Sequence, residues 1–237
     1  MGEPINVCVP TGNFGNIFAA YLAKRMGLPI QKLICASNSN NILTDFLETG
    51  IYDRNRPFHL TMSPSMDILI SSNLERLLWF VAGPQKTAFY MKQLRETGRY
   101  AVETEILSAI QADFVGYYAD ETATADTIRS TWKADKYLAD THTAVALCAA
   151  EQYLKNTDDR IPLVVDSTAS PYKFANNVYR AITGKNPSGD LEALEELSAL
   201  TNTKIPYPLA GLASRTVRFC DVCDREKMAQ KVFDFAK

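Results

Sequence analysis

Residues 6–30, NVCVPTGNFGNIFAAYLAKRMGLPI, predict a strand, a glycine-containing loop and a helix. The run over residues 5–10 is apolar on both faces, which is typical of a parallel strand buried between helices. Apolar residues between Phe14 and Leu22 recur at helical spacing, and Gly27 predicts the end of that helix. The loop at residues 11–16 therefore lies at a helix N-terminus, where backbone N–H groups and the helix dipole favour anions.

The loop fits no widespread nucleotide motif. The Gly-Lys-Ser/Thr ending of a Walker loop is missing, and so is the three-glycine spacing of a dinucleotide fold. The residues alone leave two interpretations open, an ordinary strand-to-helix turn and an anion site.

Composition excludes several classes of function. The 237 residues are 46% hydrophobic and carry a formal net charge of −2 with no run of Lys or Arg, which argues against a nucleic-acid partner. No stretch reaches the ~18 apolar residues of a membrane span, and the N-terminus has no signal pattern. We therefore predict a soluble, globular, cytoplasmic protein with no membrane partner. Five scattered cysteines indicate reduced thiols, with Cys8 and Cys35 in the core.

Strand-like and helical patterns alternate along the chain, which predicts the α/β class with a mostly parallel open sheet flanked by helices. The strand candidates are residues 5–10, 32–37 and 161–170. Asn38 to Asn41 offer capping side chains for a helix that ends at Gly50. The segment of about 75–155 reads as mainly helical, and no domain boundary is evident within residues 1–237. Three strands make an incomplete sheet, so further strands lie either inside the helical segment or outside these residues.

Two long blocks carry a resemblance to a known family. VPTGNFGNIFAAYLAKRMGLPIQKLICASNSNNILTDFLETGIYDR, residues 9–54, and LTMSPSMDILISSNLERLLW, residues 60–79, resemble threonine synthase. That family consists of pyridoxal-phosphate enzymes of the tryptophan-synthase-like fold. In it the Gly-Asn-Phe-Gly-Asn loop wraps the 5′-phosphate of pyridoxal 5′-phosphate. The resemblance implies that this phosphate is bound by Gly12, Asn13, Phe14, Gly15 and Asn16.

The resemblance also implies a reaction, the conversion of O-phospho-L-homoserine and water to L-threonine and phosphate. In the family, the lysine that forms the Schiff base with the cofactor lies upstream of the loop, in a Phe-Lys-Asp context that this sequence lacks. Lys173 belongs to another block, and we interpret it as a lysine at a helix start. The chain thus resembles the C-terminal, cofactor-phosphate part of the enzyme. We expect it to be inactive alone, to need the N-terminal part as a partner and, with an open sheet edge, to be prone to self-association.

The segment VVDSTAS resembles a family block in which a hydroxyl faces the pyridine nitrogen of the cofactor. The resemblance assigns that role to Ser167 or Thr168, and we favour Thr168; a simple helix-capping hydroxyl is the alternative. Ser170 and Tyr172 depart from the family's His and Ala, which bears on substrate specificity.

DTHTAVALCAA resembles a family block near the active site, with Thr141 in place of Pro. It offers His142 as a possible catalytic residue, against the alternative of a hydrogen-bonded structural histidine. Cys220 and Cys223 form a Cys-x-x-Cys pair without the further ligands that zinc needs, so we predict no metal site. The departures leave two other functions open, a non-catalytic module that binds an anion or cofactor and a related lyase for another amino acid.

Overall fold

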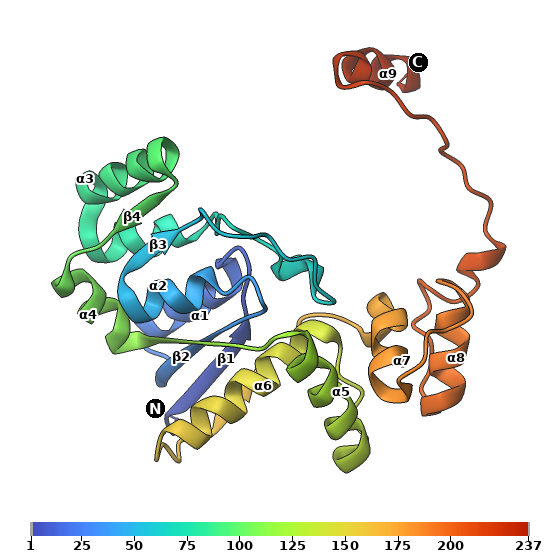
Figure 1. Ribbon diagram of the computed structural model, residues 1–237, viewed down its shortest axis with the longest axis horizontal. Coiled ribbons are helices and arrows are strands. Elements are labelled where there is room, and N and C mark those ends of the chain that lie inside the picture. The colour runs from blue at the N-terminus through green and yellow to red at the C-terminus, as the bar shows by residue number, and fades with distance from the viewer. Residues whose placement is uncertain (1, 237) are drawn as a thin grey trace. The chain divides into compact units, whose positions relative to one another are not determined.

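The computed structural model describes residues 2–236 and divides the chain into a large unit that ends at Lys204 and a small unit that begins at Ile205. The large unit is an α/β structure built on one parallel sheet (Figure 1). Within the described residues, no helix is both long and apolar enough to cross a membrane.

The sheet has four strands in the order β5-β2-β1-β6. These are β1 (Ile5–Pro10), β2 (Ile30–Ser37), β5 (Phe114–Tyr118) and β6 (Leu163–Val165). All three pairings are parallel, with Cys8 of β1 opposite both Ile34 and Val165. The carboxyl ends of β1, β2 and β6 therefore meet at one edge, which is where open parallel sheets bind ligands.

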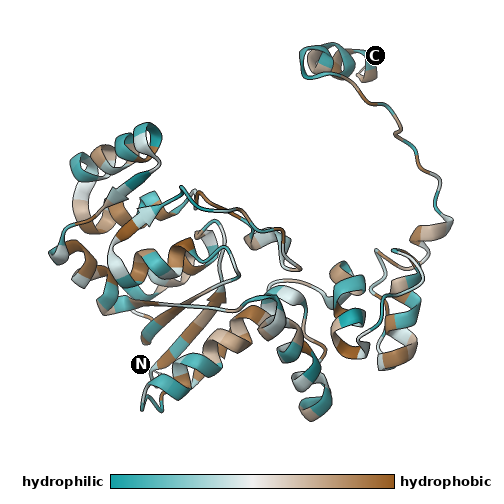
Figure 2. Cartoon of the chain, viewed as in Figure 1, coloured by the Kyte–Doolittle hydropathy of each residue, from teal (hydrophilic) through white to brown (hydrophobic). Residues whose placement is uncertain are grey.

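Helices cover both faces of this sheet, as its apolar strands require. The helices α1 (Gly15–Arg25) and α2 (Ile42–Thr49) pack on one face, and α6 (Thr141–Asn156) packs on the other. Alternate strand residues serve the two layers, because Val9 faces the first and Cys8 the second. Figure 2 shows hydrophobic residues concentrated in the strands between these helices.

A smaller layer extends the first face. The antiparallel pair β3 (Ile51–Asp53) and β4 (Arg99–Ala101) packs with α3 (Leu74–Thr97), and α4 (Thr104–Asp113) leads into β5. The helix α3 is interrupted at Gly83, where φ is 81°, directly before Pro84. The rings of Tyr52 and Tyr100 stack with their centroids 5.2 Å apart.

The helix α5 (Glu121–Asp135) comes before α6 in the chain and packs on it. The remaining helices of the large unit come after α6. The single turn η2 (Pro171–Phe174) leads into α7 (Ala175–Thr183), which ends at Gly184, and α8 (Glu192–Thr201) packs on α7. The small unit contains the short helix α9 (Met228–Phe235) and the turns η3 (Leu212–Ser214) and η4 (Arg225–Lys227). Another short turn, η1 (Pro64–Met66), lies in the loop before α3.

The structure corrects two sequence-based expectations. Residues 75–155 are not almost wholly helical, because β4 and β5 lie among the four helices of that range and β5 is an edge strand of the main sheet. The asparagine run does not cap α2 with its side chains either. The Nδ2 atoms of Asn38 and Asn40 instead donate to Asp67 Oδ1, at 2.8 and 3.1 Å, and so fasten the loop before α3 to the end of β2.

The cysteines give a testable consequence of this core. Cys8 and Cys35 are fully buried free thiols, and burial raises the pKa of both, that of Cys35 to about 12. Because the thiolate is the reactive form, we expect iodoacetamide at pH 8 to modify exposed Cys220 while both buried thiols stay unmodified until urea unfolds the chain. Peptide mass spectrometry measures each site. Equal labelling of Cys35 and Cys220 in the native protein would contradict this placement.

Candidate functional site

The loop at residues 11–16 borders a pocket of about 260 Å³ between β1 and α1. Residues 10–16 line it together with Ser65 and Asn73, which come from the loop before α3. The five loop residues singled out in the sequence, Gly12 to Asn16, therefore share one small cavity.

Two carbonyl groups of the loop are held by side chains that come from the segment before α3. Ser71 Oγ donates to the Gly12 carbonyl at 2.7 Å, and Asn73 Nδ2 donates to the Asn13 carbonyl at 2.7 Å. The described peptide bonds are trans, so the following N–H group points opposite to each carbonyl. The N–H groups of Asn13 and Phe14 consequently point away from the Ser71 and Asn73 atoms that bind these carbonyls, and within the described residues no backbone acceptor pairs with them.

Phe14 sets the turn into α1. Its backbone is left-handed (φ 62°, ψ 3°), an uncommon conformation for a bulky residue, yet its side chain is only 1% exposed. The ring packs 5.6 Å, centroid to centroid, from that of Phe114 on β5, and this burial offsets the backbone strain of about 1–3 kcal/mol. No side chain caps α1, so within the described residues its first N–H groups are left for a ligand.

Gly12 is required by a close backbone approach. A Cβ atom there would lie 2.8 Å from the Ser65 carbonyl oxygen and 3.1 Å from Met66 Cα. Both are main-chain atoms of η1, which cannot rotate aside as a side chain would. Any larger residue at position 12 must therefore displace the loop or η1.

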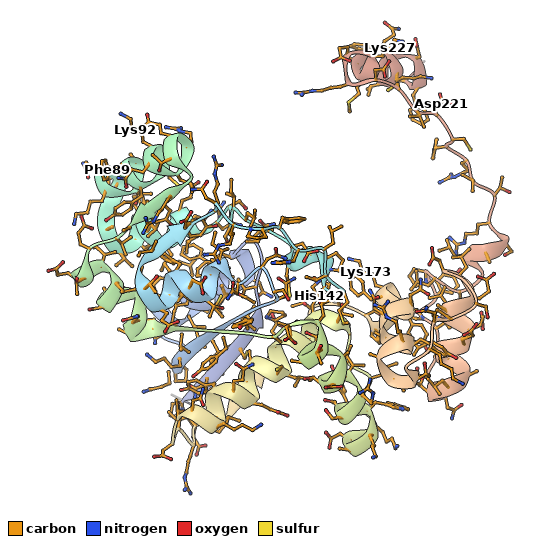
Figure 3. All side chains as sticks on the ribbon, viewed as in Figure 1. Phe89, Lys92, His142, Lys173, Asp221 and Lys227 are labelled. Carbon is orange, nitrogen blue, oxygen red and sulfur yellow. The ribbon has the colours of Figure 1, made fainter. Side chains whose placement is uncertain are left out.

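His142 holds η1 in this position. Its Nε2 accepts a hydrogen bond from the Ser65 N–H at 3.1 Å, so the proton of the neutral ring lies on Nδ1, which is 3.4 Å from Asp140 Oδ1. The side chain is buried at the start of α6, on the same side of the unit as Lys173 (Figure 3). Of the two interpretations of His142, its hydrogen bonds match those of a structural histidine.

Asp140 anchors this corner as the N-cap of α6. Its carboxylate accepts from the His142 and Thr143 N–H groups at 2.8 and 3.2 Å and from the Thr143 hydroxyl. Burial alone would raise the pKa of Asp140, but the hydrogen bonds from His142 and Thr143 together outweigh it and hold the pKa below its ordinary value. The carboxylate is therefore charged at neutral pH.

The end of β6 joins the site through Asp166. Asn16 Nδ2 donates to Asp166 Oδ2 at 2.6 Å, so the residues that follow β6 lie next to the loop. Ser167 Oγ is 3.2 Å from both the Tyr137 hydroxyl and Thr143 Oγ1, whereas the hydroxyl of exposed Thr168 has no hydrogen-bond partner among the described residues. The structure thus links Ser167 to Asp140 at the start of α6 through the Thr143 hydroxyl, and it leaves the Thr168 hydroxyl without a partner among the described residues.

Lys173 is exposed on η2, and its Nζ lies over the Phe174 ring at 5.3 Å. Among residues 2–236, no group of three or more His, Cys, Asp or Glu side chains is placed to hold a metal.

Sequence reasoning missed the residues that support the loop. Ser71 and Asn73 lie in the block at residues 60–79, but no local pattern marks them as partners of a loop more than 50 residues earlier. Tyr52 was missed as well, although its hydroxyl fixes Ser71 by accepting from the Ser71 N–H at 2.8 Å and donating to the Leu69 carbonyl at 3.2 Å.

Comparison with known proteins agrees with this geometry. The sequence model of the family "Threonine synthase, C-terminal" matches residues 143–232. Threonine synthase of Saccharomyces cerevisiae is 39% identical over 220 residues, which are 85% of this chain and 43% of the relative. The PLP-bound threonine synthase of Brucella melitensis superposes with a TM-score of 0.82 and 37% identity, over 97% of this chain and 46% of that one.

The chain belongs to the threonine synthase family. It corresponds to the C-terminal portion, and it spans less than half the length of the relatives it matches. "Threonine synthase-like 1" of Macaca fascicularis is 45% identical over 184 residues, 76% of this chain and 24% of the relative. The predicted α/β class, with a mostly parallel sheet flanked by helices, is confirmed by the sheet and by these structural neighbours.

Gly12→Ala tests the loop of this family member. The new Cβ would meet the η1 backbone, an overpacking that costs about 1–3 kcal/mol, so we expect phosphate to bind roughly 5- to 150-fold more weakly. Calorimetric titration with inorganic phosphate measures this. Gly2→Ala is the matched control, since a Cβ at Gly2 has no atom within 4 Å. Unchanged phosphate affinity in Gly12→Ala would exclude the loop as the anion site.

Asp140→Asn tests the electrostatics of the α6 cap. A carboxylate whose pKa is depressed by folding stabilises the native state above its unfolded pKa of about 3.9, and this contribution is lost as the pH falls toward the folded value. We expect the wild type to exceed the variant in free energy of unfolding at pH 7 and the difference to shrink below about pH 4. Urea titrations at both pH values measure it. A difference that does not depend on pH would contradict the lowered pKa.

Proposed function

We propose that this chain is the part of a threonine-synthase-type lyase that holds the 5′-phosphate of pyridoxal 5′-phosphate. The observation that carries the proposal is the cradle formed by the loop and α1. The outward carbonyls of Gly12 and Asn13 are held by Ser71 and Asn73, which leaves the N–H groups of Asn13 and Phe14 and the uncapped start of α1 for an anion. A phosphate dianion fits such a cradle by charge and by hydrogen bonding.

The intact enzyme, in this proposal, converts O-phospho-L-homoserine and water to L-threonine and phosphate. The cofactor supplies an electron sink for the substrate carbanions. This chain contributes binding and orientation, because the loop fixes the phosphate end and the residues after β6 lie beside it. Thr168 is the residue that we assign to the pyridine nitrogen, since its hydroxyl is free of protein partners while that of Ser167 is engaged.

His142 acts as a positioning residue in this proposal. Its buried ring has both nitrogens directed at protein atoms, at Ser65 and at Asp140, so it holds η1 under Gly12. No lysine lines the phosphate pocket within the described residues. The lysine that bonds the cofactor then comes from the part of the enzyme outside this chain, and the isolated chain has no synthase activity.

Two titrations of the isolated chain test the phosphate cradle. We expect pyridoxal 5′-phosphate to bind at least about a hundredfold more tightly than pyridoxal, which lacks the phosphate, and we expect no phosphate release from O-phosphohomoserine above the buffer rate. Equal affinity for the two compounds would contradict the cradle. Phosphate release by the chain alone would contradict its dependence on an outside lysine.

The reaction itself is tested on the protein purified from its source cell. We expect it to form threonine and phosphate in equal amounts, with O-phosphohomoserine the best of a panel of phosphorylated and β-substituted amino acids. Thr168→Ala in that protein is expected to lower kcat more than Ser167→Ala does. A better substrate elsewhere in the panel would reject threonine synthesis, and the reverse order of the two variants would reassign the ring nitrogen to Ser167.

A further inference from the structure

A second cavity, apart from the phosphate site, is a groove along the outer edge of β5. Its volume is about 590 Å³, and all five residues of the strand line it. Thr44 and Leu47 of α2 form one wall, and Gln152 and Tyr153 of α6 form the other. The groove is therefore a slot between the two helical layers at the place where the sheet stops.

The register of the sheet shows which backbone groups face this slot. Tyr118 pairs with Ser37, and the Ala119 N–H donates to the Ser37 carbonyl at 3.0 Å, so residues 117 and 119 direct their backbone groups toward β2. Because the direction alternates along a strand, the N–H and C=O groups of Gly116 and Tyr118 point into the slot. Gln152 Nε2 already donates to the Tyr118 carbonyl at 2.8 Å, which places α6 over this edge.

Side chains on the two walls also match the alternation of a strand. A Cβ at Gly116 would lie 2.7 Å from Thr44 Cα, so α2 closes tightly over one face of β5. Tyr117 points to the other face, where its ring centroid is 6.2 Å from that of Tyr153. Both helical layers thus cover β5 and line the groove at its outer edge, and layers packed about 10 Å from a sheet accommodate a strand between them.

We propose that an extended segment from the part of the enzyme outside these 237 residues joins β5 as a fifth strand of the main sheet. The proposal shares one assumption with the proposed function, namely that this chain is a portion of a longer enzyme. Its occupant follows from the relatives: the Brucella melitensis protein superposes on 97% of this chain, which accounts for only 46% of that protein. At every second residue, β5 points its backbone N–H and C=O groups into the slot. An incoming strand can form hydrogen bonds with this repeating pattern, whereas a compact ligand cannot.

The added strand would remove an exposed edge that is otherwise a site for uncontrolled pairing. At the opposite edge, β6 has three residues, whereas β5 offers five. Apolar residues on both faces of the incoming segment would meet Leu47 on one wall and Tyr153 on the other. The partner is therefore an extended, predominantly apolar stretch rather than a charged one.

Amide hydrogen exchange resolves the prediction residue by residue. The two samples are the protein purified from its source cell and the 237-residue chain alone, without cofactor in either. We expect the amides of Gly116 and Tyr118 to exchange at least about a hundredfold more slowly in the first sample. The amide of Tyr117, which faces β2, is the internal control and is protected in both.

Each outcome decides the proposal. Equal, rapid exchange of Gly116 and Tyr118 in both samples would overturn it, as would a source-cell protein of only 237 residues with those amides unprotected. Protection in the isolated chain that rises with its concentration would assign the edge to a second copy and likewise overturn it. None of these results depends on catalysis, so the fifth strand and the proposed reaction fail separately.

A pair of proline variants gives a second measurement. Tyr118→Pro removes an N–H that faces the slot, and proline is tolerated at an open edge, so we expect a larger fall in Tm for the source-cell protein than for the isolated chain. Tyr117→Pro removes an N–H that faces β2 and should lower Tm in both. A Tyr118→Pro variant with the same small effect in both proteins would argue against an added strand.

Discussion

The left-handed turn at Phe14 is the constraint on which the site depends. It joins the loop that follows β1 to the first residue of α1, and it sets the direction in which the helix begins beside the cavity. A glycine would adopt this conformation more easily but would supply no ring to bury against Phe114. Phe14 therefore both strains the backbone and anchors it through its buried ring. The loop is held in this way without a side-chain cap on α1, and such a cap would compete with an anion for the first N–H groups.

Around this turn, three segments that are far apart in sequence contact one another, and each contact involves a main-chain atom. The Ser65 carbonyl lies under Gly12, the Asn73 N–H donates to the Asn13 carbonyl at 3.1 Å, and His142 reaches across from α6 to hold Ser65. Rigid neighbours suit a site whose task is orientation, because each hydrogen bond to the ligand is then set before the ligand arrives. Tyr52 extends this support into the β3–β4 layer through Ser71.

The sequence predicted what local signals determine and missed what pairing determines. The strands β1 and β2, the helix α1 and the helix end at Gly50 follow from apolar patterns and glycine positions. By contrast, FVGYY at residues 114–118 is a short run that follows a helix directly, and only its pairing with β2 makes it a strand. Asn38 has the local chemistry of a cap, yet its side-chain amide donates to half-buried Asp67 instead of to the start of α2.

The same contrast between local signals and long-range contacts applies to the site residues. The loop was recognisable because its glycines and asparagines are contiguous, whereas its supports are single polar residues whose importance arises from the fold. Ser65 is an example, since it contributes its main chain rather than its side chain to both Gly12 and His142. No property of a serine in the sequence predicts that role.

The bond between Asn16 and Asp166 has a consequence for biosynthesis. The two residues are 150 positions apart, so at about 5–20 residues per second the ribosome takes roughly 8 to 30 seconds to make the second after the first. During that interval β1, α1 and β2 are available to assemble, but β1 lacks its neighbour β6. Asn16 is thus made well before Asp166, the residue that binds its side chain.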